Sequence, residues 1–156
     1  MSTTKGKRMK YTESTFYKQL HAVFPGFIKR VENELEVGTP DVYFSSAYAT
    51  GWMELKCHRG DRARGKVSIP FRPGQYAWLR QNWQYCGLSM LAVWGADGYY
   101  FFVNQHIQIV YDTRTLFLER ALKVKELNRE SVIAVLEMAD CIREGTNPGL
   151  PSLGWV

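Results

Sequence analysis

Residues 52–57 of the chain, W-M-E-L-K-C, have the alternating pattern of a β-strand whose two faces differ in chemistry. Because successive side chains of a strand point to opposite faces, Glu54 and Lys56 are predicted to share one face and Met53 and Leu55 the other. We expect a helix to cover the apolar face. The other face then holds a carboxylate and an ammonium group next to each other on a rigid element.

A second carboxylate is predicted near the first. The segment G-T-P-D-V-Y-F begins with a turn at residues 38–40, and Asp41 then starts a strand that runs to Phe44. From the start of this neighbouring strand, Asp41 can reach the face that carries Glu54. A lone Pro-Asp is usually a turn and a lone Glu-x-Lys is usually a solvated strand face. The order and spacing of the two together favour a functional pair.

Two carboxylates and a lysine in this arrangement suit the hydrolysis of a phosphodiester. The oxygens of Asp41 and Glu54 can bind Mg²⁺ while water remains on the ion, and the carbonyl of Leu55 can add a backbone ligand. The ion polarises the phosphate and lowers the pKa of a bound water. Lys56 can orient that water and stabilise the negative charge that develops.

The rest of the chain predicts an α/β fold in which a mixed sheet is flanked by helices. Thr12 is suited to cap a first helix, which ends at Pro25-Gly26. Asp97-Gly98 is a hairpin signal. The expected strands are residues 27–31, 41–44, 52–57, 88–94 and 99–103, with a sheet extension at 107–111.

Two further helices are predicted from apolar residues at helical spacing. The first begins at Pro73 and stops at Gly87, with an apolar face made of Tyr76, Leu79, Trp83 and Cys86. The second ends at Gly145 and carries the apolar stripe Val132, Ile133, Leu136, Ala139 and Ile142. This stripe is expected either to form a dimer interface or to pack on the chain's own sheet.

The bulk composition excludes few functions. The formal charge of +5 permits a polyanionic partner without identifying one. No apolar run approaches the roughly 20 residues that span a bilayer, and no signal-peptide pattern follows the N-terminus. We therefore expect an intracellular, cytoplasmic protein with no membrane contact. Cys57, Cys86 and Cys141 are widely spaced, which predicts reduced, mostly buried thiols and no zinc site.

The letters P-D, ending at Asp41, followed by E-L-K, ending at Lys56, resemble the signature of PD-(D/E)xK nucleases. They most resemble small VRR-NUC-like domains and phage junction-resolving endonucleases. The similarity spans residues 13–103 as an order of elements and is sharpest over residues 38–56. It implies a restriction-endonuclease-like core in which Asp41 and Glu54 hold Mg²⁺, replaceable by Mn²⁺, and Lys56 positions the attacking water. No nucleotide cofactor is expected.

Two more residues take candidate roles from this resemblance. In these families a glutamate on the helix before the core can join the metal site, and Glu13 matches that position. The alternative is a favourable first-turn charge on the helix dipole. A polar residue, often glutamine, lies in the helix after the E-x-K strand, and Gln75 matches it. It would hold a water or a phosphate near the metal; the alternative is an exposed first-turn glutamine.

Basic side chains follow directly after Lys56. They lie in the glycine-containing segment R-G-D-R-A-R-G-K and continue to the start of the next helix. Because this loop adjoins the proposed site, phosphate contact is favoured over a merely solvated loop. The expected DNA-binding residues are Arg59, Arg62, Arg64, Lys66 and Arg72.

The expected organisation is a flexible basic arm at residues 1–11, a nuclease core at 12–112, a helical extension at 113–145 and an irregular tail at 146–156. The expected function is that of a Mg²⁺-dependent DNA endonuclease. It is expected to act as a homodimer on branched DNA such as Holliday junctions. The alternatives are a restriction-like or nicking endonuclease, a repair or recombination exonuclease, and a non-catalytic nucleic-acid-binding domain.

Overall fold

The computed structural model of the chain describes residues 10–32, 36–58 and 65–145. Its elements are α1 (Glu13–Val23), β1 (Gly26–Arg30), β2 (Val42–Ser46), β3 (Thr50–Cys57), β4 (Val67–Ser68), α2 (Gln75–Gln84), β5 (Ser89–Gly95), β6 (Gly98–Val103), the 3₁₀ turn η1 (Asn104–His106), β7 (Val110–Tyr111), α3 (Arg114–Arg120), β8 (Leu122–Val124) and α4 (Arg129–Glu144). Most of the expected basic arm (1–9) and the expected irregular tail (146–156) lie outside the described residues.

Six strands form one mixed sheet in the order β1-β2-β3-β5-β6-β8. Strands β3 and β5 run parallel at its centre, and the other neighbouring pairs are antiparallel. A parallel pair requires a crossover connection, which α2 supplies here. The predicted hairpin at Asp97-Gly98 joins β5 to β6. The expected mixed sheet flanked by helices is confirmed.

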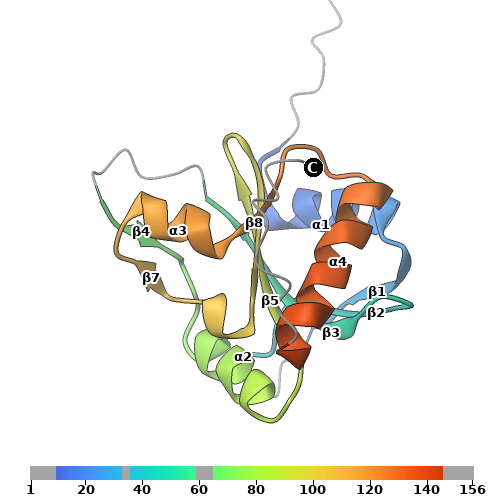
Figure 1. Ribbon diagram of the computed structural model, residues 1–156, viewed down its shortest axis with the longest axis horizontal. Helices are drawn as coiled ribbons and strands as arrows, with labels where there is room; N and C mark the ends of the chain where they lie inside the picture. Colours follow the sequence, from blue (N-terminus) through green and yellow to red (C-terminus); the bar gives the residue numbers. More distant parts are fainter. Residues whose placement is uncertain (1–9, 33–35, 59–64, 146–156) are drawn as a thin grey trace, which may run out of the picture.

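Helices cover both faces of the sheet (Figure 1). Helices α1 and α4 pack on one face, where their apolar side chains share a large hydrophobic cluster with the central strands. Helices α2 and α3 pack on the other face, together with the small sheet formed by β4 and β7. The centre of the main sheet is therefore buried on both sides.

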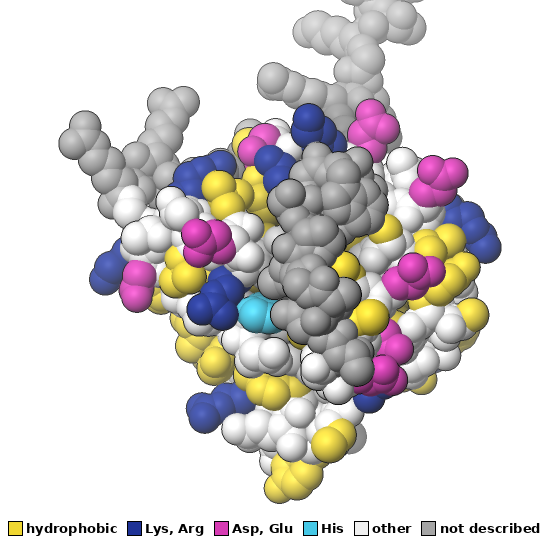
Figure 2. Space-filling view, in the orientation of Figure 1, with side chains coloured by type: hydrophobic (Ala, Val, Ile, Leu, Met, Phe, Trp, Pro, Cys, Tyr) yellow, Lys and Arg dark blue, Asp and Glu magenta, His cyan; other side chains and the backbone are white. Residues whose placement is uncertain are grey.

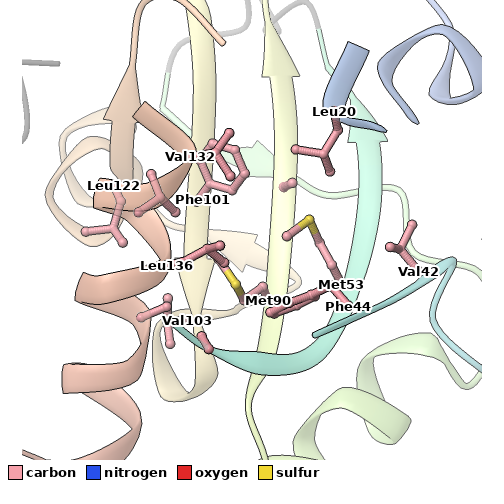
Figure 3. Close-up of a cluster of buried hydrophobic side chains, with 14 of the residues drawn as sticks. Leu20, Val42, Phe44, Met53, Met90, Phe101, Val103, Leu122, Val132 and Leu136 are labelled. Atoms are coloured by element: carbon pink, nitrogen blue, oxygen red, sulfur yellow. The ribbon is translucent and has the colours of Figure 1, made fainter. Parts of the chain in front are cut away.

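The alternation predicted for the third strand is present in β3. Met53 and Leu55 lie in the same buried cluster as Leu20 of α1, and Figure 3 shows Met53 and Leu20 on neighbouring elements of that cluster. The opposite face carries Glu54 and Lys56, which are 0% and 2% exposed. The apolar face is covered by a helix, as predicted.

Helices α1 and α4 begin at capping side chains. Thr12 caps α1 by accepting a hydrogen bond from the backbone N–H of Thr15 (3.2 Å), as predicted. Helix α4 begins with a capping box between Asn128 and Ser131 and ends at Gly145, which has a φ of 72°. At 16 residues α4 is the longest helix, and no helix of the described residues is long and apolar enough to cross a bilayer.

The apolar stripe of α4 packs on the chain's own sheet. Val132, Leu136 and Ala139 are at most 3% exposed and belong to the large cluster. Figure 3 shows Val132 beside Phe101 of β6 and Leu136 beside Val103 of the same strand. Of the two expected roles for this stripe, internal packing is therefore the one found, and the dimer interface expected on it is wrong.

Helix α2 differs from its prediction at both ends. It begins at Gln75, after Gly74 in the left-handed conformation (φ 86°), rather than at Pro73. The chain leaves the helix before Cys86, which has a φ of 68°, so Gly87 is not the residue that stops the helix. Because Cys86 has left the helical path, it is exposed and does not belong to the buried helix face as predicted.

All three cysteines are free thiols, as predicted. Cys57 and Cys141 are half-buried and Cys86 is exposed, so the expectation that the thiols are mostly buried is wrong. Cys57 is the last residue of β3 and packs against the edge of the large hydrophobic cluster.

The far edge of the main sheet is β8 rather than the predicted extension at residues 107–111. Strand β8 pairs with β6, whereas β7 pairs with β4 in the separate small sheet. Residues 113–145, predicted as a helical extension, contain α3 and α4 as expected but also this strand. Strand β8 contributes Leu122 and Val124 to the large hydrophobic cluster, and α4 contributes to the same cluster. These residues therefore share one core with the preceding elements.

Candidate active site at the open end of strand β3

Strands β2 and β3 separate at the point where the predicted charged residues lie. Strand β2 pairs with residues 50–53 of β3, whereas β5 pairs with residues 52–57. Beyond Met53, the edge of β3 that faces β2 is therefore no longer covered by a strand ladder. Asp41, which directly precedes β2, and Glu54, which follows Met53, stand at this fork.

The carboxylates of Asp41 and Glu54 each accept a hydrogen bond from the backbone of the segment that carries the other. The backbone N–H of Asp41 donates to Glu54 Oε2 (3.2 Å), and the backbone N–H of Leu55 donates to Asp41 Oδ2 (3.2 Å). Asp41 is half-buried and Glu54 is fully buried. The predicted neighbourhood of the two acidic residues is confirmed by these contacts.

Lys56 is a buried cation surrounded by acceptors. Its Nζ atom lies 3.3 Å from Glu54 Oε1 and donates a hydrogen bond to Gln75 Oε1 (3.0 Å). A weaker ion pair joins it to Glu13 at 3.8 Å. Its Nζ atom also lies 5.9 Å from the centre of the Phe71 ring. These partners hold the ammonium group in one place beside the carboxylates.

Gln75 joins the acid and the base of the site. As the first residue of α2 it is 6% exposed, so the alternative of an exposed first-turn glutamine is wrong. Its Nε2 donates to Glu54 Oε1 (2.8 Å), while its Oε1 accepts from Lys56 and from the backbone N–H of Arg72 (2.8 Å). The amide therefore fixes the distance between the two charged side chains.

The positive charge of Lys56 does not fully offset the effect of burial and of Asp41 on Glu54. Burial and the adjacent Asp41 carboxyl raise the pKa of Glu54 to about 8, and the opposing effect of Lys56 is smaller. Two carboxyl groups this close resist ionising together. A cation bound between them would relieve this repulsion and allow both to be ionised at neutral pH.

The donor set fits a hard divalent cation that keeps part of its water. Asp41 and Glu54 supply carboxylate oxygens, and no group of three or more His, Cys, Asp or Glu side chains suited to a metal is found in the described part of the chain. The carbonyl of Leu55 points to the same edge as its N–H, which contacts Asp41. Two carboxylates, a carbonyl and water are a ligand set suited to Mg²⁺ and too poor in nitrogen and sulfur for structural zinc.

Glu13 is placed next to Lys56 rather than in a cluster with both acidic residues. Its side chain is 32% exposed and lies in the first turn of α1. Its expected role as a metal ligand stays a prediction, and its observed contact is an ion pair with the lysine.

A depression of about 500 Å³ opens beside the Asp41 carboxylate. Asp41, Gln75, Arg72 and Arg30 line it, together with the turn that contains Gly38. Of the predicted DNA-binding residues, Arg72 is exposed at its rim and Lys66 is exposed just before β4. Arg59, Arg62 and Arg64 lie outside the described residues.

A close contact between Gly38 and Gly74, which holds two segments of the site together, was not predicted. Gly38 has a φ of 94°, and a Cβ atom on it would lie 2.5 Å from the carbonyl of Gly74. The turn before Asp41 is thus packed directly on the residue that precedes Gln75. The sequence signal that could have predicted this contact is the pair of glycines, Gly38 and Gly74, because a close approach of two backbones favours glycine.

The basic residues do not gather on the face of the molecule that carries α3 and α4. Figure 2 shows Lys and Arg side chains interspersed with Asp and Glu over the described part of that face. This mixed surface is not a uniformly positive one of the kind that would hold DNA over a wide area.

No known family model matches the sequence, and no curated protein matches it. Among solved structures, the chain is similar to Hjc from Archaeoglobus fulgidus, a Holliday junction resolvase from an archaeal hyperthermophile. The two are 11% identical, with a TM-score of 0.50 over 80% of this chain and 99% of that one. The fold is therefore of the restriction-endonuclease-like class, with a mixed sheet between helices.

Proposed function

We propose that the chain is a Mg²⁺-dependent endodeoxyribonuclease. The observation that carries the proposal is a buried lysine, Lys56, held between Glu54 and Gln75 at an open strand end, where Glu54 also contacts Asp41. A lysine and two carboxylates are costly to bury unless they serve a charged ligand or each other. A phosphodiester with its cation is a ligand that suits all three.

Each residue of the site has a part in the proposed reaction. A water oxygen attacks phosphorus while the bond to the leaving oxygen breaks, and the leaving oxygen takes up a proton. Bound Mg²⁺, held by Asp41, Glu54 and the Leu55 carbonyl, supplies charge neutralisation and a more acidic water. Lys56 orients the water and stabilises the charge on the phosphoryl oxygens. Gln75 keeps Lys56 and Glu54 at a fixed separation.

The preferred substrate is proposed to be branched DNA, in particular a four-way junction. The fold likeness to a Holliday junction resolvase supports this choice over a sequence-reading enzyme. Two symmetric strands must be cut, so the proposed functional unit is a homodimer. Because the α4 stripe is buried within the chain, the dimer must use another surface.

A cleavage assay tests the proposal. The purified protein with Mg²⁺ is incubated with labelled linear, nicked, flapped and four-way DNA. Cutting should require Mg²⁺ or Mn²⁺, stop with EDTA, and be lost in Asp41→Asn and Glu54→Gln, which keep the size of each side chain. Both variants should still bind DNA. Substantial cutting by either variant would contradict the assignment, and binding without any cutting by the native protein would favour the non-catalytic alternative.

A further inference from the structure

The face of β1, β2 and β3 that carries the candidate site continues outward as an ordered set of side chains. Next to the pair Asp41 and Glu54, one step along the strands, the register places Lys29, Tyr43 and Trp52 in a row. A second step places Phe27, Ser45 and Thr50 in a further row. Alternation puts all of them on one face, and each step is about 7 Å.

Aromatic rings connect these rows. The rings of Phe27 and Tyr43 lie 6.3 Å apart, those of Tyr43 and Trp52 lie 5.3 Å apart, and Trp52 lies 5.1 Å from Trp78 of α2. This series of ring contacts therefore runs from Trp78 of α2, the helix that supplies Gln75 to the site, to Phe27 of the edge strand β1.

The outer end is exposed to solvent. Phe27 is 56% exposed on β1, an edge strand of the main sheet, and Lys29 two residues later is also exposed. A single exposed aromatic residue is ordinary. The exposed Phe27 and Lys29 lead in register to the half-buried Asp41 and the buried Glu54. This face therefore offers an aromatic ring for stacking and a positive charge in adjacent positions.

We propose that this face, defined by Phe27, Lys29, Tyr43 and Trp52, binds a DNA strand whose bases are unstacked. The inference rests on the proposed nuclease function and names the form of DNA that the site receives. An aromatic ring beside a basic side chain is how proteins hold single-stranded nucleic acid, because every base has a flat face and every nucleotide a phosphate. Branched DNA offers such a strand where bases are unpaired, as in a flap, which agrees with branched DNA as the proposed class of substrate.

A second copy of the chain is a poorer occupant of this face. Lysine is depleted in the centre of protein–protein interfaces, and here Lys29 stands in the central row beside Tyr43. The register also leads from this face directly to Asp41, which lines the depression beside the candidate site.

Binding measured in EDTA tests the inference without cleavage. Fluorescence anisotropy compares a labelled single-stranded oligonucleotide with the matching duplex. Phe27→Leu, which keeps an apolar side chain but removes the ring, should weaken single-strand binding about fivefold or more, and duplex binding less. Phe27→Tyr, which keeps an aromatic ring, should bind the single strand as the native protein does. Lys29→Ala should lower the log–log salt slope by about 0.7. The control Tyr85→Leu alters an aromatic residue that is 81% exposed at the end of α2.

The outcomes separate this inference from the nuclease assignment. Unchanged single-strand affinity in Phe27→Leu, or an equal loss in Tyr85→Leu, would overturn the inference, and Mg²⁺-dependent cutting would then still stand. A change of sedimentation mass in Phe27→Leu would assign the face to a second copy and would also overturn it. Loss of cutting in Asp41→Asn with the single-strand preference intact would support both conclusions.

Discussion

The Nζ atom of Lys56 lies 3.3 Å from the Glu54 carboxylate, and the two side chains are 2% and 0% exposed. Both project from the same face of β3, two residues apart, and Gln75 bonds to both side chains, so the strand and this amide together hold their separation. A carboxylate and an ammonium group that cannot move apart form a site prepared for a charged ligand, because no reorganisation is needed when the ligand binds.

Replacement of Lys56 by methionine should separate catalysis from binding. Lys56→Met keeps the length of the side chain and removes the charge, so the cutting rate should fall about 10²-fold or more, as when one transition-state donor is lost. DNA affinity should change little. The control is Lys18→Met, an exposed lysine of α1. A rate within a few-fold of the native rate would show that Lys56 is only structural.

The stability of the metal-free protein should depend on pH through Glu54. Burial and Asp41 raise the pKa of Glu54 from 4.5 to about 8, so the folded state holds this proton more tightly than the unfolded state. The contribution to the free energy of unfolding is therefore present below about pH 4.5 and is lost as pH rises through 8. The slope is at most about 1.4 kcal/mol per pH unit.

Urea unfolding at pH 6 and pH 8 in EDTA measures this dependence. Glu54→Gln, which cannot ionise, should reduce it, and the difference between the two proteins isolates Glu54 from other titrating groups. Added Mg²⁺ should stabilise the native protein more at pH 8 than at pH 6, because metal binding requires the ionised carboxyl. An identical pH dependence in the variant would contradict the assigned pKa shift.

Replacement of Gly38 should disturb the site as well as the fold. Gly38→Ala places a Cβ atom against the Gly74 carbonyl and forces alanine to a φ of 94°, so we expect a loss of at least about 1 kcal/mol in stability. Cutting should also fall, because Asp41 and Gln75 flank this contact. Gly145→Ala has a comparable φ of 72° but nothing within 4 Å, and it should lower stability alone. Equal activity of the two variants would argue against the positioning role.

The parts of the site that could be predicted from sequence are those fixed by short-range patterns. The alternation around Glu54 and Lys56 needs only the period of a strand, and Asp41 follows from the turn before it. Gln75 was reached through family resemblance, although its two contacts with Lys56 and Glu54 depend on how α2 is placed against β3. Sequence alone does not state that placement.

The parts that were missed depend on contacts between distant segments. Strand β8 is three residues long, and Leu122-Lys123-Val124 becomes a strand only because it pairs with β6. The contact of Gly38 with Gly74 joins two turns 36 positions apart in the chain. Neither feature has a local pattern long enough to predict it.

Neutralising the basic loop should weaken DNA binding in a salt-dependent way. Replacement of Arg62, Arg64 and Lys66 by alanine should reduce the log–log salt slope by about 0.9 for each lost phosphate contact. The measurement is a salt titration of duplex binding in EDTA. An unchanged slope would place DNA elsewhere on the surface. The matched control replaces three exposed basic residues of other elements, Lys18, Lys125 and Arg129.

The protein should be a homodimer that prefers four-way junctions to linear duplex. One chain carries one pair of Asp41 and Glu54, and paired cuts in a two-fold junction require two such sites related by two-fold symmetry. Sedimentation should give twice the chain mass of 18.0 kDa, and competition binding should favour the junction over a duplex of equal length. Ile133→Ser, a half-buried position on α4, should leave the mass unchanged because that helix packs on its own sheet. A monomer that cuts linear DNA at a fixed sequence would keep the nuclease assignment and replace the junction-resolving enzyme with a restriction-like one.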